Sequence, residues 1–231
     1  MHEKKSLNFD FLDESPKKTD EKVNASTDVS VPISSTDKIS FFHYFKKCFS
    51  NFPKFAKTHL VASNPKYLFL AIWVLGMGNA ADRLTSSDSS TWGEVWAIVL
   101  FGGILAGVIA YYIGGWFYHL RVKWSKGSGT IDTARNIYTF SSLPIPVMAV
   151  SSLLINHLAY GSDYFNAYYS DASSVDIIFG LLTIAAIGYS INISYHAVRE
   201  VMNVQKGRAI WWFVVAPAIF YILIFAGALF E

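Results

Sequence analysis

Five polar side chains near the predicted ends of apolar stretches could together bind an anion. Asn192, His196 and Arg199 fall at positions i, i+4 and i+7, so a helix would carry them on one face. His119 and Arg135 are predicted at a similar depth in neighbouring stretches. Such a cluster suits a phosphate headgroup or a partner protein. The alternative is that these side chains face a helix bundle or extend their polar ends to the membrane surface.

Two prolines, Pro144 and Pro146, interrupt the third apolar stretch of the chain. Each removes a backbone donor, so together they would kink or break a helix. In hydrocarbon the freed carbonyl groups need other partners, and Ser141, Ser142 and Ser151 are close enough in sequence to supply hydroxyls. A broken helix can line a substrate cavity in a transporter. The commoner result is a kink that only shapes the bundle, and both interpretations stay open.

The sequence contains no pattern that is typical of an enzyme. It has no His-Glu-x-x-His and no Gly-x-Ser-x-Gly, and its single cysteine and six histidines show no metal-ligand spacing. Gly127–Thr130 follows no strand and leads to no phosphate-binding lysine, which favours a tight turn with Thr130 as the helix N-cap. The net charge of +2 does not favour nucleic acid as a partner. We therefore expect a non-enzymatic protein without a cofactor or metal.

The elements that must position these residues are apolar helices. Hydrophobic residues make up 52% of the 231 residues and charged residues only 16%, well below the roughly 25% charged residues of soluble domains. The apolar stretches are continuous rather than alternating, which favours helices over a β-barrel. The sequence predicts an all-α polytopic membrane bundle of about five transmembrane helices in contact with the lipid bilayer. The predicted spans are about residues 66–83, 92–119, 133–160, 174–198 and 209–230.

The connecting segments predict how this bundle is oriented. Basic residues crowd the N-terminal segment, the second-to-third loop and the fourth-to-fifth loop, whereas the third-to-fourth loop has aspartates but no lysine or arginine. With five spans, all the basic segments share one side, which the positive-inside rule makes cytoplasmic. We therefore predict a cytoplasmic N-terminus and an outside C-terminus, in a bacterial inner membrane or a eukaryotic endomembrane.

Two regions precede the predicted transmembrane domain, which covers residues 61–231. Residues 1–38 are polar and predict a disordered cytoplasmic tail. Residues 39–60 predict an amphipathic interfacial segment, in which phenylalanines recur at helical spacing beside lysines. Such a helix lies on the membrane surface or packs on its own membrane domain. The residues concerned are Phe41, Phe42, Phe45, Phe49, Phe52, Lys46 and Lys47.

Small residues recur at four-residue intervals in the second span, and they predict a flat stripe where another helix can approach closely. The contact is either internal packing or a contact between copies in a homo-oligomer. The residues of the stripe are Gly102, Gly103, Ala106, Gly107, Ala110 and Gly114.

Taken in order, four stretches resemble the YIP-domain family of five-span membrane proteins over about residues 40–230. They are Asn64–Tyr67, the Gly-rich second span, Gly127–Thr130 with the following Ala134, Tyr138, Ser141 and Pro144, and Gly180–Arg199 with the last span. The resemblance implies a protein that organises membrane or recruits partners at its cytoplasmic face. It implies a small GTPase as partner if the chain is of the eukaryotic type. The proline-broken third span keeps a small, oligomeric transporter or channel as the alternative.

Overall fold

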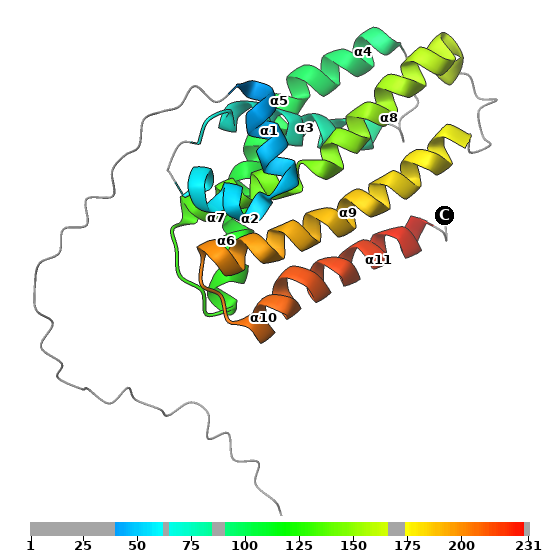
Figure 1. Cartoon of the computed structure of the whole chain (residues 1–231). Coiled ribbons are helices and arrows are strands. Elements are labelled where there is room, and N and C mark those ends of the chain that lie inside the picture. The colour runs from blue at the N-terminus through cyan, green and yellow to red at the C-terminus, as the bar shows by residue number, and fades with distance from the viewer. Residues whose placement is uncertain (1–39, 62–64, 85–90, 166–173, 229–231) are drawn as a thin grey trace, which may run out of the picture. The chain divides into compact units, whose positions relative to one another are not determined.

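The computed structural model in Figure 1 describes residues 40–61, 65–84, 91–165 and 174–228. All of these residues belong to one unit, Ile39–Glu231. Helices and the turns between them account for the described residues, and no strand occurs among them. The structure therefore confirms the predicted all-α class. The predicted polar tail, residues 1–38, lies outside the described residues.

Five helical segments correspond to the predicted spans. The first is α3 (Leu68–Leu84), and the fourth is α9 (Ser174–Val201). The second segment runs through α4 (Trp92–Ala97), η2 (Ile98–Gly102), α5 (Gly103–Ile109), η3 (Ala110–Gly114) and α6 (Gly115–Trp124). The third joins α7 (Ile131–Ser142) to α8 (Pro144–Tyr160) and the short turn η4 (Gly161–Phe165). The fifth joins α10 (Lys206–Ile210), η5 (Trp211–Val215) and α11 (Ala216–Ala228).

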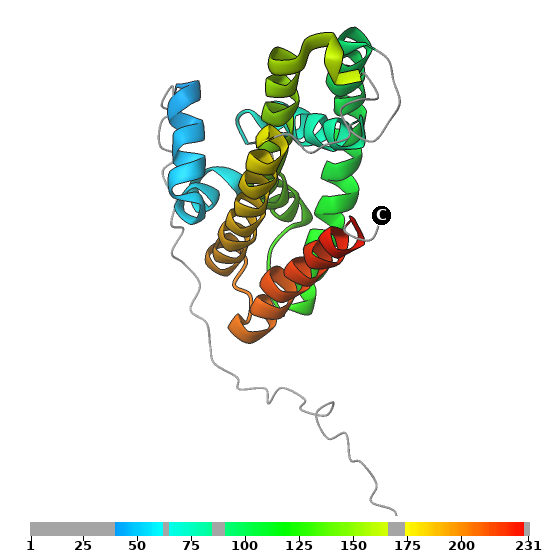
Figure 2. The same cartoon turned by 90° about the vertical axis from the view of Figure 1, so that its right-hand side faces the viewer.

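Among the described residues, four helices are long and apolar enough to cross a membrane, and the apolar part of α3, Leu68–Ala81, is shorter. At 1.5 Å per residue, the 17 residues of α3 extend about 25 Å, against a hydrocarbon core of about 30 Å. The fold is thus a multi-pass membrane bundle of about five spans, the first of them short. In Figures 1 and 2, α9 runs between α8 and the α10–α11 segment.

The closest packing in the bundle is between α3 and α5, where two backbones touch directly. A Cβ atom added to Gly76 would lie 1.8 Å from the carbonyl oxygen of Gly103, and one added to Gly107 would lie 2.1 Å from that of Ile72. Only glycine allows this approach, because any side chain would collide with main-chain atoms that cannot rotate away. Both glycines of the second span belong to the predicted stripe.

The rest of that stripe is placed differently. Gly114 faces Tyr138 of α7, whose hydroxyl would lie 2.6 Å from a Cβ at Gly114. Gly102 would meet only Ile98 of its own helix, and Ala106 and Ala110 are both half-buried. Internal packing thus accounts for the three glycines that face α3 and α7, while an oligomer contact stays a prediction.

The N-terminal segment is packed on the bundle. It comprises α1 (Phe41–Ser50), α2 (Phe52–Phe55) and η1 (Ala56–Leu60), and α2 and η1 lie against α9 and α7. The side-chain amide of Asn136 donates to the Leu60 carbonyl at 3.1 Å, and the Tyr189 hydroxyl donates to the Phe49 carbonyl. The side chains that face the bundle are Tyr44, Cys48, Phe52, Phe55 and Leu60, all buried.

The other residues of the predicted interfacial set lie on the outer face or at its edge. Phe41, Phe42 and Phe49 are exposed, as are Lys46 and Lys47, and Phe45 is half-buried. The structure thus shows the segment held by one face, with aromatic and lysine side chains on the other. Contact of that outer face with a membrane surface stays a prediction.

The two basic loops are joined at one end of the bundle. The Ser128 N–H donates to the Met202 carbonyl at 2.8 Å, and the Gln205 N–H donates to the Ser125 carbonyl at 2.9 Å. A loop after the second span and a loop after the fourth span must share a side in a five-span protein, and these bonds satisfy that requirement. The compartment that this side faces stays a prediction.

The opposite end is closed by contacts between the start of α4 and the end of α8. Trp92 stacks on His157 with ring centroids 4.3 Å apart, and its indole N–H donates to the Gly161 carbonyl. The indole N–H of Trp96 donates to Nδ1 of His157 at 2.9 Å. The start of the second helical segment and the end of the third therefore lie together, as the alternation of five spans requires.

Candidate functional site

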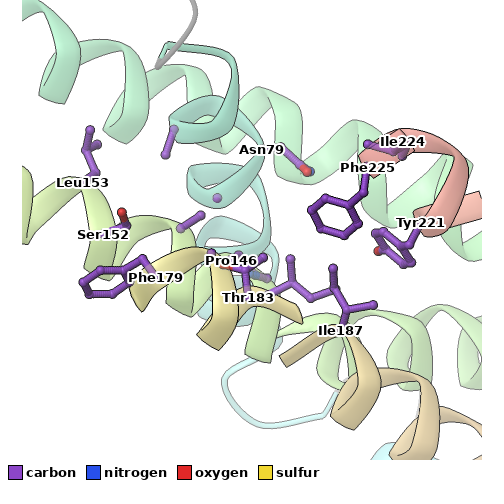
Figure 3. A pocket seen from close by; sticks show the side chains of 15 residues that line it. Asn79, Pro146, Ser152, Leu153, Phe179, Thr183, Ile187, Tyr221, Ile224 and Phe225 are labelled. Carbon is purple, nitrogen blue, oxygen red and sulfur yellow. The ribbon is translucent and has the colours of Figure 1, made fainter. Parts of the chain in front are cut away.

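A cavity of about 390 Å³ lies beside Pro146, between α3, α8, α9 and α11. Gly78 of α3 touches the proline, since a Cβ at Gly78 would lie 2.4 Å from the Pro146 Cα. Figure 3 shows Ile187 from α9 and Tyr221 from α11 among the side chains that line the cavity. The volume is within the roughly 300–1,000 Å³ that small-molecule sites occupy. Of the two prolines at which the sequence predicts a kink or a cavity, Pro146 lines this cavity, and Pro144 is buried at the start of α8.

The lining is mostly apolar, with one polar side chain from each of the four helices. These are Asn79, Ser152, Thr183 and Tyr221. The cavity is partly open, and its lining includes Gly180, Ile224 and Phe225, which are exposed. Because these three residues belong to the fourth and fifth helical segments, the opening would face the lipid hydrocarbon in a bilayer. A molecule could therefore enter sideways from the bilayer.

A smaller cavity of about 100 Å³, with more polar residues among those that line it, adjoins the first one. The two share Ile145, Ile187 and Tyr221 in their linings, so these residues form the boundary between them. We call the smaller cavity the Arg121 alcove. Its polar lining residues are Tyr118, Arg121, Tyr138, Ser141, Ser142, Ser190, Ser194 and Tyr221.

Arg121 is held in the alcove by aromatic rings and one carbonyl group. Its guanidinium carbon lies 4.5 Å from the ring centroid of Phe213 and 5.5 Å from that of Tyr118. Its Nε donates to the Trp212 carbonyl at 2.8 Å. In the described part of the chain no carboxylate lies within ion-pairing distance of this cation. A half-buried arginine near the end of a span thus keeps its charge without a counter-ion.

The hydroxyl groups of the alcove differ in how well they are paired. Tyr118 and Ser194 share a hydrogen bond of 2.8 Å, and the Ser141 hydroxyl donates to the Tyr138 carbonyl at 3.2 Å. Ser190 is 7% exposed, and its Oγ has no hydrogen-bond partner among the described residues. A buried, unpaired hydroxyl calls for a specific explanation, because such groups are normally satisfied. The alcove thus combines a free positive charge with a spare donor.

The five residues predicted to form a polar cluster lie in two places. Asn192, His196 and Arg199 are exposed on the outer face of α9. His119 lies near Arg135, close enough for their charges to interact, on facing sides of α6 and α7. No contact is found between the two groups in the described residues. Joint binding of one ligand by all five residues stays a prediction.

Arg135 has the partners that Arg121 lacks. Its Nη1 lies 3.2 Å from Oδ1 of Asp132, and its guanidinium lies 4.8 Å from the ring centroid of Tyr112. The ion pair neutralises this cation locally, so it offers less to an outside anion. His119 has a buried Nδ1 without a partner among the described residues.

Sequence reasoning missed most of the Arg121 alcove. In the sequence, Arg121 is one of the basic residues of the second-to-third loop that predict the orientation, although it follows Tyr118 by three residues on one helical face. Ser190 and Ser194 stand four residues apart in an apolar span, a pattern that could have pointed to a polar face. The alcove brings together helices that are far apart in the sequence, since Arg121 bonds to a residue about 90 positions away. A local sequence pattern could not reveal that contact.

Within the described residues no three His, Cys, Asp or Glu side chains come together to hold a metal ion.

A family profile of the Yip1 domain matches residues 52–227, which reach from α2 into α11. No curated protein and no solved structure matches the chain. The matched range covers well over half of the chain and includes all five helical segments. The chain is therefore a multi-pass integral membrane protein, and it belongs to the Yip1 domain family.

Proposed function

We propose that this protein organises the membrane or recruits partners at its cytoplasmic face, and that it does so without catalysing a reaction. The observation that carries the proposal is the N-terminal segment, which is fixed to the bundle by one face and exposes aromatic and lysine side chains on the other. Phe42, Lys46 and Phe49 stand at positions i, i+4 and i+7 of α1, so they share a face. Phe42 is 82% exposed.

A face of this kind suits the boundary between headgroups and acyl chains. Aromatic rings can insert into that boundary, while lysine stems extend and place their charges among anionic headgroups. Because the buried side of the segment is anchored to α7 and α9, any insertion would act on the membrane through the whole bundle.

The joined basic loops supply a second surface at the end that we propose to be cytoplasmic. Lys123 and Lys126 from one loop region, and Lys206 and Arg208 from the other, are all exposed. Their shared positive charge suits anionic lipids or an acidic protein surface. A small GTPase would be such a partner if the chain is of the eukaryotic type.

The proposal is tested by reconstituting the full chain into vesicles with and without anionic lipid and measuring vesicle diameters by electron cryomicroscopy. The combined variant Phe42→Ala/Phe49→Ala should lose the wild-type effect on diameter. A matched control is Phe101→Ala/Phe220→Ala, because these phenylalanines are also exposed, at 75% and 60%, but lie within spans. Equal diameters for the wild type and the Phe42/Phe49 variant would reject the proposal.

The cavity beside Pro146 favours a second candidate, a small transporter or channel. Its support is the set of polar groups from four helices around one partly open space. Proteoliposomes should then show solute or ion flux that Ser152→Trp, placed in the cavity lining, abolishes. Absence of flux in the wild type, or flux unchanged by this substitution, would dismiss this candidate.

A further inference from the structure

We propose that the Arg121 alcove and the cavity beside Pro146 together bind a single-chain anionic amphiphile. Its phosphate or carboxylate head would contact Arg121, and its acyl chain would lie in the larger cavity beside Pro146. The inference goes beyond the proposed function, because it concerns the interior of the bundle rather than its cytoplasmic face.

The charge of Arg121 is the first argument. Arginine carries five N–H donors and is always protonated, and here Nε is used by the Trp212 carbonyl. Within the described residues the two Nη groups have neither a hydrogen-bond partner nor a carboxylate, and two aromatic rings lie beside the guanidinium. The Trp212 carbonyl occupies one of the five donors, whereas a cation at membrane depth normally has its charge matched by an anion or by several carbonyl groups. The free donors are therefore positioned for an anion that comes from outside the chain.

The hydroxyl groups around Arg121 are the second argument. Ser190, whose buried Oγ is unpaired among the described residues, lines the alcove, as do Ser142 and Tyr138. Hydroxyls can donate hydrogen bonds to anionic oxygens, and such bonds are stronger than those between neutral groups. The described lining of both cavities contains no Asp or Glu that would repel an anion. A phosphate or carboxylate would satisfy both the charge and the spare donor.

The size and position of the two cavities are the third argument. A water molecule needs about 10–15 Å³ of cavity volume, so the alcove of about 100 Å³ has room for a small anionic head. The larger cavity is mainly apolar and opens to lipid beside Gly180 and Phe225. It meets the alcove at Ile187 and Tyr221. A molecule with a charged head and an apolar tail matches this arrangement, in which the alcove with its cation adjoins a mainly apolar cavity.

The test uses the full chain purified in detergent and three probes that separate head from tail. Oleoyl-lysophosphatidic acid carries both, monooleoylglycerol lacks the phosphate, and inorganic phosphate lacks the chain. Native mass spectrometry measures each dissociation constant. We expect the lysophosphatidic acid to bind at least about ten-fold more tightly than monooleoylglycerol, as a few charge-assisted hydrogen bonds would produce. Equal binding of the two lipids would overturn the proposal, and so would inorganic phosphate that binds as tightly as the lysophosphatidic acid.

Two variants and one control connect the binding to the alcove. Arg121→Gln should reduce lysophosphatidic acid binding to the level of monooleoylglycerol, whereas Lys123→Gln, which removes an exposed charge two residues away, should change it less than two-fold. Equal losses in both would mean general attraction to positive charge and would overturn the proposal. Ser142→Leu fills the alcove and leaves the cation in place, so it keeps the test valid if Arg121→Gln fails to fold. Wild-type binding by Ser142→Leu would also reject the site.

Discussion

Replacing Gly76 by alanine should separate α3 from α5 and destabilise the whole bundle. The new Cβ would lie 1.8 Å from the Gly103 carbonyl oxygen and 2.3 Å from the Gly107 nitrogen. An ordinary contact for a Cβ begins at 3.4 Å, so the two backbones must move apart by about 1.6 Å. Since both obstructing atoms belong to a helical main chain, no side-chain rotation can relieve the collision.

The expected cost follows from two opposing effects. Overpacking in a close-packed interior costs about 1–3 kcal/mol, and a collision with the main chain belongs at the upper end of that range. Alanine also favours the helix by about 1 kcal/mol relative to glycine. The collision is larger, so we expect a net loss of about 2 kcal/mol in the free energy of unfolding.

Unfolding by SDS in mixed micelles, followed by circular dichroism, measures this difference. Gly102→Ala is the matched control, because its Cβ would meet only Ile98 Cγ2 at 3.6 Å. The control should be as stable as the wild type or slightly more stable. If Gly76→Ala unfolds at the same SDS fraction as Gly102→Ala, the direct backbone contact between α3 and α5 is wrong.

Three further outcomes follow from single contacts. Tyr118→Phe should cost about 1 kcal/mol in SDS unfolding, because it removes a buried hydroxyl bond, while Tyr112→Phe, on an exposed ring, should cost nothing measurable. Asn136→Ala should loosen the N-terminal segment, since it removes the donor to the η1 carbonyl, and trypsin should then cleave that segment faster than in Asn192→Ala. Burial raises the pKa of the Cys48 thiol from 9.0 to about 12. The buried neutral thiol therefore contributes fully to the free energy of unfolding below pH 9, and this contribution is lost as the pH rises toward 12. Maleimide labelling of Cys48 at pH 8 should accordingly be slow in the folded protein and fast in SDS, and fast labelling before unfolding would contradict the burial.

The sequence was sufficient to predict the spans, because hydrocarbon demands long apolar helices and leaves few alternatives. The inward face of the N-terminal segment could not be predicted in the same way. Tyr44 and Cys48 face the bundle and Phe42 faces outward, yet aromatic residues occur on both faces of α1. Which face is buried depends on the shape of α7 and α9.

The candidate site was predictable only in part. Pro146 was singled out because a proline inside a span frees carbonyl groups, and the structure places it at a cavity. The charge of Arg121 was visible, but its environment was not, because the rings and the carbonyl around it come from α6 and η5. Counting charges predicts on which side of the membrane a residue lies, but not how deeply its side chain is buried. A cation in a loop and the cation of the alcove therefore look alike in the sequence.

The central claim is that five helices cross the membrane with both basic loops on one side. Single cysteines at Ser128, Asn203 and Ser162, each in a Cys48→Ser background, test it most directly with a membrane-impermeant maleimide applied to intact and then to opened cells or vesicles. The account predicts that the cysteines at Ser128 and Asn203 react from the same side, which we expect to be cytoplasmic, and that the one at Ser162 reacts from the other. Labelling at Ser162 from the same side as Ser128 would contradict the five-span arrangement.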